Sequence, residues 1–462
     1  MAMTTAIQSW ERREAESFFH TFSDLPSLRQ DGPVVIERGE GAYIVDTGGR
    51  RYFEGNSGLW NMTLGFSEQR LTDAAARQYA ELPGYHTFFG RNSKPSIALA
   101  ERMLALAPVP MSRAFFTNSG SEANESVVKL LWMMWAHDGQ PQRRKLLTRK
   151  NAYHGATVMA ASLTAKDYNK AFGLPLPEIV VLDCPHAYRY AAPGESDDEF
   201  CARLAANLEV TIEAEGPETI AGMFAEPVMG AGGVIVPPQN YFGHIQPILK
   251  RHGIPLVADE VICGFGRTGN LWGTQTMGMQ PDIMVASKSM SAGYFPMGAV
   301  MLSKDIDRRA LAAAEAFEEF PHGFTTGGHP VGCAISLEAI RIITEEGVLD
   351  DIRNVGSVLQ SGLDQLAQHP MVGEARGVGL MGALEMVSDK TSKAPFAGHL
   401  RIGERIAKAA RDRGFIIRPL GSSVVLAPPF ISTAREIEAL VATLGEILDQ
   451  VYASARKEAA LE

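Results

Sequence analysis

The chain has 462 residues, of which 45% are hydrophobic and 21% charged, a composition typical of a soluble globular protein that is long enough for two domains. Its formal net charge of −10 at pH 7 argues against nucleic acid or an anionic membrane as a partner, because both select for clustered Lys and Arg. The four cysteines lack the spacing of a metal or redox motif and suit a reducing compartment.

The N-terminus has no basic region followed by an apolar core, so no signal peptide is expected. No apolar run is long enough to cross a bilayer. These features predict a cytoplasmic protein without a membrane partner.

Residues 1–60 form a mixed N-terminal segment. Apolar stretches at 41–45 and 51–53 flank a turn and predict a hairpin, and a glycine-containing loop at 54–61 follows. A helix is predicted near 67–82, where it ends at Pro83 and Gly84.

Residues 61–335 read as a large α/β domain, because short apolar strands alternate with helical segments. The long connections between strands require crossovers, so most of the sheet should be parallel. The segment 183–199, with its Pro, Gly and acidic residues, is predicted to be an exposed excursion. The predicted strands are 113–117, 145–148, 220–225, 254–258, 283–286 and 298–302.

The pattern changes after residue 335, so residues 336–462 are predicted to form a smaller α+β domain. Amphipathic helices are expected at 335–346 and 350–368, and short strands at 379–385 and 415–418. A last helix is expected to begin near Thr433 with a polar cap.

Two predicted strands each deliver one ionisable side chain at their exit. Asp259 ends the run Ile254–Ala258, and Lys288 follows the run Ile283–Ala286. Lone charges at the ends of apolar strands are costly to desolvate, and the carboxyl ends of parallel strands are where open α/β sheets bind ligands. A turn cap and a strand-end cation facing water are the ordinary structural alternatives.

A second signal lies where a strand ends at Thr117 and a helix begins. Ser119 and Glu122 have the spacing of a capping box, and Gly120 and Ser121 would make the helix N-terminus a phosphate site. A simple helix cap is the alternative. The pair His322 and His329 lacks the short spacing of a zinc site, so no metal is expected.

The long strings Leu256–Gly269 and Pro281–Gly293 resemble the signature of class III pyridoxal-phosphate aminotransferases. The resemblance runs from about residue 15 to 450. It implies fold-type I: a mostly parallel central sheet flanked by helices, with the smaller α+β domain beside it.

In that family a lysine matching Lys288 carries pyridoxal 5'-phosphate as a Schiff base, and an aspartate matching Asp259 sits under the pyridine nitrogen. The resemblance makes Lys288 and Asp259 the catalytic residues. It assigns the remaining cofactor contacts to Gly120, Ser121, Tyr153, His154, Glu226, Val261 and Thr325. Tyr153 and Val261 would cover the two ring faces, and ordinary packing is the alternative for both.

In relatives, residues matching Thr325 and Phe22 come from the neighbouring subunit, which implies a homodimer, or a tetramer as the alternative, with shared sites. Many class III relatives have Gln where this chain has Ile262, and the branch without it comprises the ω-transaminases, which use amines and pyruvate. The substrate positions that match this branch are Phe22, Leu59, Trp60, Phe88, Tyr153, Ala231 and Arg418.

The resemblance therefore predicts ping-pong transfer of an amino group from a primary amine, or from an ω- or β-amino acid, to a keto acid, most simply pyruvate. Arg418 would bind carboxylates, with a structural ion pair as its alternative role. Decarboxylation or intramolecular amino transfer on the same scaffold remains open. A nucleotide-binding dehydrogenase is disfavoured, because no G-x-G-x-x-G follows a first strand.

Overall fold

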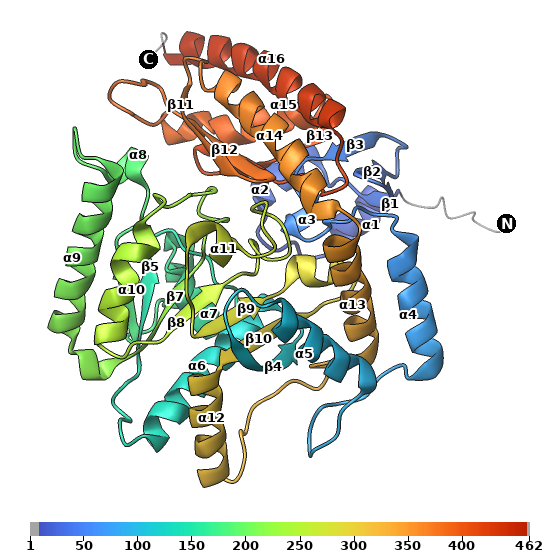
Figure 1. Ribbon diagram of the computed structural model, residues 1–462. Helices are drawn as coiled ribbons and strands as arrows, with labels where there is room; N and C mark the ends of the chain where they lie inside the picture. The colour runs from blue at the N-terminus through green and yellow to red at the C-terminus, as the bar shows by residue number, and fades with distance from the viewer. Residues whose placement is uncertain (1–8, 460–462) are drawn as a thin grey trace.

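The computed structural model describes residues 9–459, and its central element is a seven-stranded sheet (Figure 1). β10 pairs antiparallel with both of its neighbours, and the four remaining pairs are parallel. The predicted mostly parallel sheet is confirmed. In spatial order the strands are β4 (Met111–Thr117), β10 (Gly298–Ser303), β9 (Ile283–Ala286), β8 (Leu256–Asp259), β7 (Ile220–Ala225), β5 (Lys145–Arg149) and β6 (Ile179–Leu182). All six predicted strands are present, and β6 was not predicted.

Helices cover both faces of this sheet, and the strands are apolar on both sides for that reason. In β8, Val257 packs into one core, whereas Leu256 and Ala258 pack into the other. One face is covered by α6 (Gly120–His137), α7 (Val158–Thr164) and α12 (Lys304–Ala316). The other face is covered by α5 (Lys94–Leu106), α9 (Asp197–Glu215), α10 (Tyr241–Arg251) and α13 (Pro330–Glu345).

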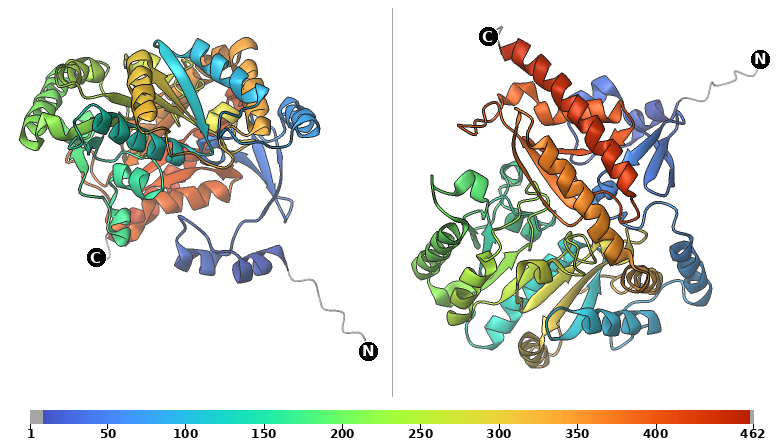
Figure 2. Two further views of the ribbon diagram at one scale, coloured as in Figure 1. Left: turned by 90° about the horizontal axis from the view of Figure 1, so that it is seen from below. Right: turned by 45° about the horizontal axis from the view of Figure 1, so that its top comes forward.

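The N-terminal segment is joined to the C-terminal region. The predicted hairpin is β2 (Tyr43–Asp46) and β3 (Arg51–Glu54), extended by β1 (Ile36–Glu40), and β13 (Phe415–Ile416) adds to β3 in parallel. The helices α1 (Trp10–Ser17) and α2 (Leu25–Asp31) lie at the margin of the molecule (Figure 2). Two ion pairs link this segment to α15 (Ile402–Arg411). Asp31 of α2 pairs with Lys408 at 2.9 Å, and Asp24, the N-cap of α2, pairs with Arg401, the residue before α15, at 2.7 Å.

A second antiparallel sheet lies in the C-terminal region and has the order β11 (Val372–Val378), β12 (Met381–Met386), β15 (Ser423–Leu426), β14 (Arg418–Leu420). The predicted strand 415–418 is split, because β13 and β14 belong to different sheets and the buried Ile417 lies between them. The helices α14 (Val348–Leu366) and α16 (Ala434–Ala459) pack side by side, and α14 also packs on this sheet. The Thr433 hydroxyl caps α16 by accepting a hydrogen bond from Glu436 N. We propose that this region and the N-terminal segment form one unit beside the large domain.

Connecting helices complete the chain: α3 (Ser57–Trp60), α4 (Gln69–Glu81), α8 (Ala187–Tyr190) and α11 (Gly273–Met277). The expectation of an exposed excursion at 183–199 is wrong in its first part, because Cys184, Pro185 and His186 are buried. Polar contacts with the C-terminal region hold this part in place, and they have no signature in the local sequence.

No helix among residues 9–459 has the length and apolar character needed to cross a membrane. The signal-peptide expectation rests on residues 1–8, which lie outside the described part of the chain.

Candidate active site

Five strands that run in one direction end at the same edge of the sheet, and each is followed by residues singled out from the sequence. The N-terminus of α6 follows β4, Tyr153 and His154 follow β5, and Glu226 follows β7. Asp259 is the last residue of β8, and Lys288 comes two residues after β9. The sheet topology therefore gathers side chains that are far apart in sequence.

Asp259 is held by three hydrogen bonds in a buried position. Its Oδ2 atom lies 2.8 Å from His154 Nδ1 and accepts from Asn124 Nδ2 at 2.9 Å. Within the described part of the chain, its Oδ1 atom accepts only from Val261 N, at 3.1 Å. Asn124, which sequence reasoning missed, lies one helical turn after Gly120 on α6, and that spacing is the signal that could have revealed it.

Lys288 occupies a strained and desolvated position. Its φ of 42° is in the left-handed region that a side chain rarely adopts. Burial lowers the pKa of its ammonium to about 8, although the charges of Asp259 and Glu226 oppose this shift. A substantial neutral fraction near physiological pH makes this amine both a nucleophile and a base.

The N-terminus of α6 is partly capped. Ser119 Oγ accepts from Glu122 N at 3.2 Å as predicted, but the Glu122 carboxylate accepts from Asn118 N rather than completing the capping box. Ser121 Oγ accepts from Ala156 N at 3.1 Å. The first-turn N–H groups of this 18-residue helix point out of it, which gives the edge a positive electrostatic end.

Glu226 lies behind the site and organises two loops. Its carboxylate accepts from Tyr153 N and from Gly230 N, each at 3.1 Å, and burial raises its pKa. Arg149 lies beneath and donates to the Glu226 carbonyl at 2.5 Å. Tyr153 and the loop that bears Ala231 are therefore fixed by the same buried residue.

A cationic patch lies on the side of the C-terminal region. Arg418 is half-buried, and burial lowers its pKa, whereas its electrostatic neighbours Tyr153 and Tyr168 oppose this. Lys166 Nζ donates to the Ala231 carbonyl at 2.6 Å. Sequence reasoning missed Lys166 and Tyr168, which follow Tyr153 in a stretch without a recognisable pattern.

The loop at 57–60 is conformationally strained. Ser57 and Trp60 both have positive φ, of 48° and 68°, on either side of Gly58. Trp60 is buried, whereas Leu59 is 62% exposed. Strained backbone of this kind is frequent at functional sites.

Comparison with known proteins agrees with this geometry. Residues 27–448 match the family Aminotransferase class-III. The PMP-bound aminotransferase from Vibrio fluvialis is 53% identical, with a TM-score of 0.96 over 97% of this chain and 100% of that one. An omega-aminotransferase from Paracoccus denitrificans is 52% identical, with a TM-score of 0.95 over 97% of this chain and 100% of that one. Gamma-aminobutyrate transaminase 1 of Oryza sativa subsp. indica is 42% identical over 418 residues, 90% of this chain and 81% of that protein.

The chain belongs to the class III aminotransferases. Pyridoxal phosphate is the cofactor of this family, and the residues present at the sheet edge fit it. His154 Nε2 is buried and has no hydrogen-bond partner among residues 9–459. A Cβ on Gly120 would lie 2.7 Å from Val261 Cγ2, so only glycine leaves the N-terminus of α6 open beside that side chain.

Phe22 lies in the segment between α1 and α2 and is 74% exposed. Its ring packs edge-on against Tyr168 of the same chain with the centroids 5.7 Å apart. That Phe22 serves the site of the neighbouring subunit stays a prediction.

Phe88 and Thr325 both lie in irregular segments rather than at the strand ends. Phe88 lines a cavity of about 500 Å³ together with Phe320 and Phe324. Thr325 is exposed, and the next residue, Thr326, donates to Asn118 Oδ1 at 2.7 Å.

The two histidines of the segment 322–330 have structural roles. His322 Nε2 lies 2.7 Å from Ser126 Oγ, and its Nδ1 lies 3.0 Å from Lys129 Nζ. His329 Nδ1 accepts from Val331 N at 3.3 Å, which caps α13.

Proposed function

We propose that this aminotransferase moves the amino group of a primary amine, or of an ω- or β-amino acid, to pyruvate and forms alanine. Arg418 carries this proposal. Among residues 9–459 no carboxylate lies within ion-pair distance of its guanidinium, although it is half-buried between Tyr153 and Tyr168. A guanidinium in that position is available to bind a substrate carboxylate through two parallel hydrogen bonds.

The cofactor would be held by residues from five strand ends. Lys288 would bond to it covalently, Asp259 would hold a proton on its ring nitrogen, and Gly120 and Ser121 would bind its phosphate. Tyr153 and Val261 would cover its ring faces. When bound, pyridoxal phosphate supplies an aldehyde that accepts the amino group and a ring that takes up electrons.

The chain's own groups move the protons. Burial lowers the pKa of Lys288 to about 8, so its Nζ would be able to remove a proton from the substrate Cα and deliver it to the aldehyde carbon of the cofactor. His154 and Asn124 keep the Asp259 carboxylate oriented by donating to the same oxygen. Glu226 holds Tyr153 and the loop of Ala231 through backbone amides and so excludes water behind them.

The apolar part of the amine would lie beside Leu59, Trp60, Phe22 and Ala231. Ile262 supports this assignment, because it is buried and packs against Gly230. A glutamine at this position would bring a polar amide into the wall, whereas isoleucine keeps the wall apolar.

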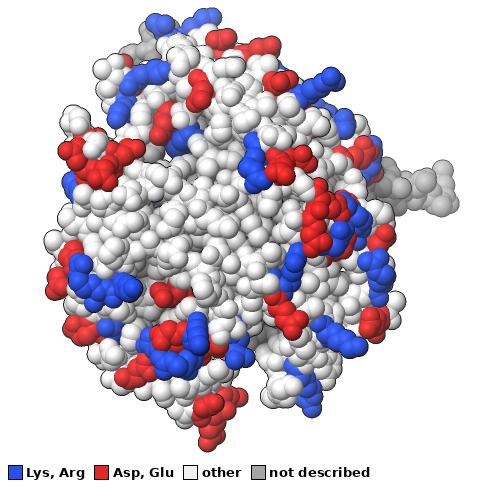
Figure 3. All heavy atoms as spheres, in the orientation of Figure 1, with Lys and Arg blue, Asp and Glu red and all other residues white. Residues whose placement is uncertain are grey.

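We also propose a homodimer with shared sites, in which Phe88 and Thr325 reach the partner's cofactor pocket. The segment beside them is apolar at the surface: Phe89 is 83% exposed, Phe317 51% and Ile97 48%. On the face shown in Figure 3, charged side chains gather toward the rim and leave the middle, over α11, largely uncharged. Such a surface suits a subunit interface.

The test of the reaction is a screen of amine donors with pyruvate, measured by alanine formation. Alanine that forms in proportion to the amine consumed supports the proposal. Release of carbon dioxide, or turnover without any keto acid, would instead indicate decarboxylation or intramolecular amino transfer. Sedimentation tests the assembly, because an active monomer at assay concentration contradicts shared sites.

The location proposed for this chain is the cytoplasm. All four cysteines are free and buried, as is usual in a reducing compartment.

A further inference from the structure

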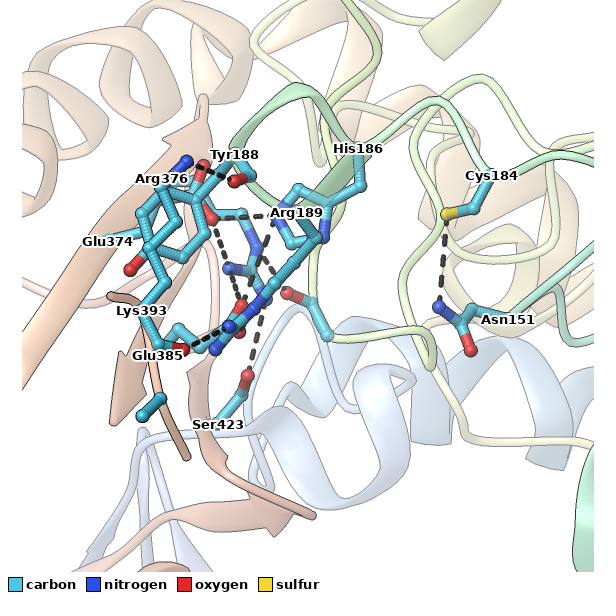
Figure 4. A network of polar contacts seen from close by, with 12 residues as sticks. Asn151, Cys184, His186, Tyr188, Arg189, Glu374, Arg376, Glu385, Lys393 and Ser423 are labelled. Atoms are coloured by element: carbon cyan, nitrogen blue, oxygen red, sulfur yellow. Dashed lines mark hydrogen bonds and ion pairs between the residues drawn. The ribbon is translucent and has the colours of Figure 1, made fainter. Parts of the chain in front are cut away.

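Arg376, on β11, has a side chain that is 7% exposed and that contacts its own strand and three other segments outside the cofactor site (Figure 4). Its NH1 group lies 2.5 Å from Glu374 Oε2 and 2.6 Å from Glu385 Oε2. Its Nε donates to the Gly233 carbonyl at 2.9 Å, and its NH2 group donates to Ser423 Oγ at 3.2 Å. Only a guanidinium offers enough donors, in a rigid plane, to hold these groups together.

The contact with Gly233 reaches the loop of residues 229–235, which bears Ala231. Gly233 has a φ of 108°, and a Cβ there would lie 3.0 Å from Arg376 NH2, so glycine is needed for both conformation and approach. The opposite end of the loop is held by Glu226, which accepts from Gly230 N. Arg376 and Glu226 therefore bind this loop at two different residues, Gly233 and Gly230.

The contact with Ser423 reaches the strand that bears Arg418. Ser423 lies on β15 opposite Leu420 of β14, and Arg418 begins β14 opposite Val425. Arg376 thus binds, with one rigid planar group, the loop that carries Ala231 and the antiparallel pair that carries Arg418. Both residues are assigned to the substrate pocket proposed above.

The rest of the cluster fixes the guanidinium in place. His186 Nε2 lies 2.7 Å from Glu374 Oε2, and Arg189 binds Glu385. Although burial raises the pKa of Glu374, the hydrogen bond from His186 and the charge of Arg376 hold it below its ordinary value. His186, Glu374 and Glu385 could by their spacing hold a metal ion, but the Arg376 guanidinium already binds both carboxylates.

We propose that Arg376 is a positioning residue for substrate specificity, which sets the separation between the loop of Ala231 and the strand of Arg418. Its loss would leave the strand ends with Lys288 and Asp259 unchanged and would loosen one wall of the pocket. The effect on substrate specificity rests on the proposed function. The effect on the position of the loop does not.

The test compares Arg376→Lys with Arg189→Lys. Both variants keep a positive charge in the cluster, but a lysine ammonium at 376 cannot reach both Gly233 and Ser423. Arg189 contacts Glu385 and the Lys393 carbonyl and touches neither Gly233 nor Ser423, so it is the matched control. Hydrogen exchange of the holoenzyme without substrate should be about tenfold faster for the backbone amides of residues 229–235 in Arg376→Lys. The same amides should exchange at the wild-type rate in Arg189→Lys.

The kinetic arm uses two amine donors, one small and one bulky, with pyruvate. Arg376→Lys should change the ratio of their KM values about threefold to tenfold, with kcat changed less than KM.

Equal exchange rates in Arg376→Lys and wild type, or equal acceleration in both variants, would overturn the inference. If Arg376→Lys does not fold, Ser423→Ala is the second variant, because it removes only the hydrogen bond from Arg376 to the strand pair that carries Arg418. An unchanged KM ratio in Ser423→Ala overturns the inference. Absence of alanine formation in the wild type would instead contradict the proposed function and would leave the exchange result interpretable.

Discussion

His154 Nδ1 lies 2.8 Å from Asp259 Oδ2, and the two side chains are 0% and 3% exposed. Since the carboxylate accepts, Nδ1 carries the proton of the imidazole. Asn124 donates to the same oxygen, which leaves Oδ1 with a single backbone donor. The carboxylate is therefore held rigidly, and Oδ1, with one backbone donor, retains lone-pair capacity for the cofactor.

Asp259→Asn should fold and lose turnover by about 10²–10³-fold, because an amide is not a negative charge and cannot keep the ring nitrogen protonated. Steady-state kinetics of the purified variant measure this loss. Asp282→Asn is the matched control: Asp282 is also mostly buried beside β9, but it accepts from Leu256 N at the opposite edge of the sheet. Near-normal turnover of Asp259→Asn would contradict the role of Asp259.

Lys288→Ala should retain the fold and lose both transamination and the visible absorbance of lysine-bound pyridoxal phosphate. The reason is that, among residues 9–459, Lys288 is the amine at the exit of β9. Circular dichroism checks the fold, and absorbance and alanine formation check the function. Lys145→Ala, at the start of β5 and paired with Glu215 at 2.8 Å, should keep both properties. A Lys288→Ala enzyme with substantial turnover would show that the assignment is wrong.

Glu54 predicts a specific dependence of stability on pH. Burial raises its pKa from 4.5 to about 7, although backbone hydrogen bonds from Asn56 and Gly58 oppose this shift. Below pH 4.5 the carboxyl is protonated in both states. Between pH 4.5 and 7 the unfolded chain releases the proton and the folded chain keeps it, so the free energy of unfolding falls as pH rises. The full loss above pH 7 is about 3 kcal/mol.

Glu54→Gln should remove this part of the pH dependence, because glutamine mimics the neutral carboxyl. Denaturant midpoints at pH 5 and pH 8 measure it: the variant should be more stable than the wild type at pH 8 and about equal at pH 5. Glu260, whose pKa burial also raises to about 7, should leave a residual slope in both proteins. Glu37→Gln, at an exposed position, should change neither midpoint. A parallel shift of Glu54→Gln at both pH values would rule out titration of Glu54 as the cause.

The strand ends and the helix start could be predicted from the sequence because their signals are local. Asp259 and Lys288 each close a short apolar run, and Gly120 lies between a strand and a helix. Asn124 has a local signal in its position one helical turn after Gly120, although its partner Asp259 is 135 residues away. Lys166 could not be found in this way, because its partner is 65 residues away and no pattern surrounds it. The six predicted strands were similarly readable from continuous apolar runs, whereas the split of 415–418 between two sheets depends on neighbours that sequence periodicity does not identify.

The buried start of the segment 183–199 illustrates the same limit. Pro, Gly and acidic residues are typical of exposed connections, but His186 reaches Glu374 across 188 residues of sequence. Arg376 was not a candidate at all, because a single arginine in a strand has no pattern. Its role depends on four contacts that only the folded chain brings together.

Arg418→Ala should separate the two kinds of substrate. A charge-assisted hydrogen bond contributes about 1.5–3 kcal/mol, so pyruvate and any donor with a carboxylate should bind about 10- to 100-fold more weakly. An amine without a carboxylate makes no such bond and should react at nearly the wild-type rate. Single-turnover half-reactions with each substrate measure the two effects separately.

The matched control for that experiment is Arg413→Ala, which removes a guanidinium paired with Glu446 at 3.1 Å on the surface of the same region. It should leave both half-reactions unchanged, because Arg413 bonds only toward α16. Arg418 differs in being half-buried with tyrosines rather than carboxylates around it. If Arg418→Ala slows the half-reactions of both substrate types equally, the arginine supports the fold of the pocket and does not recognise the carboxylate.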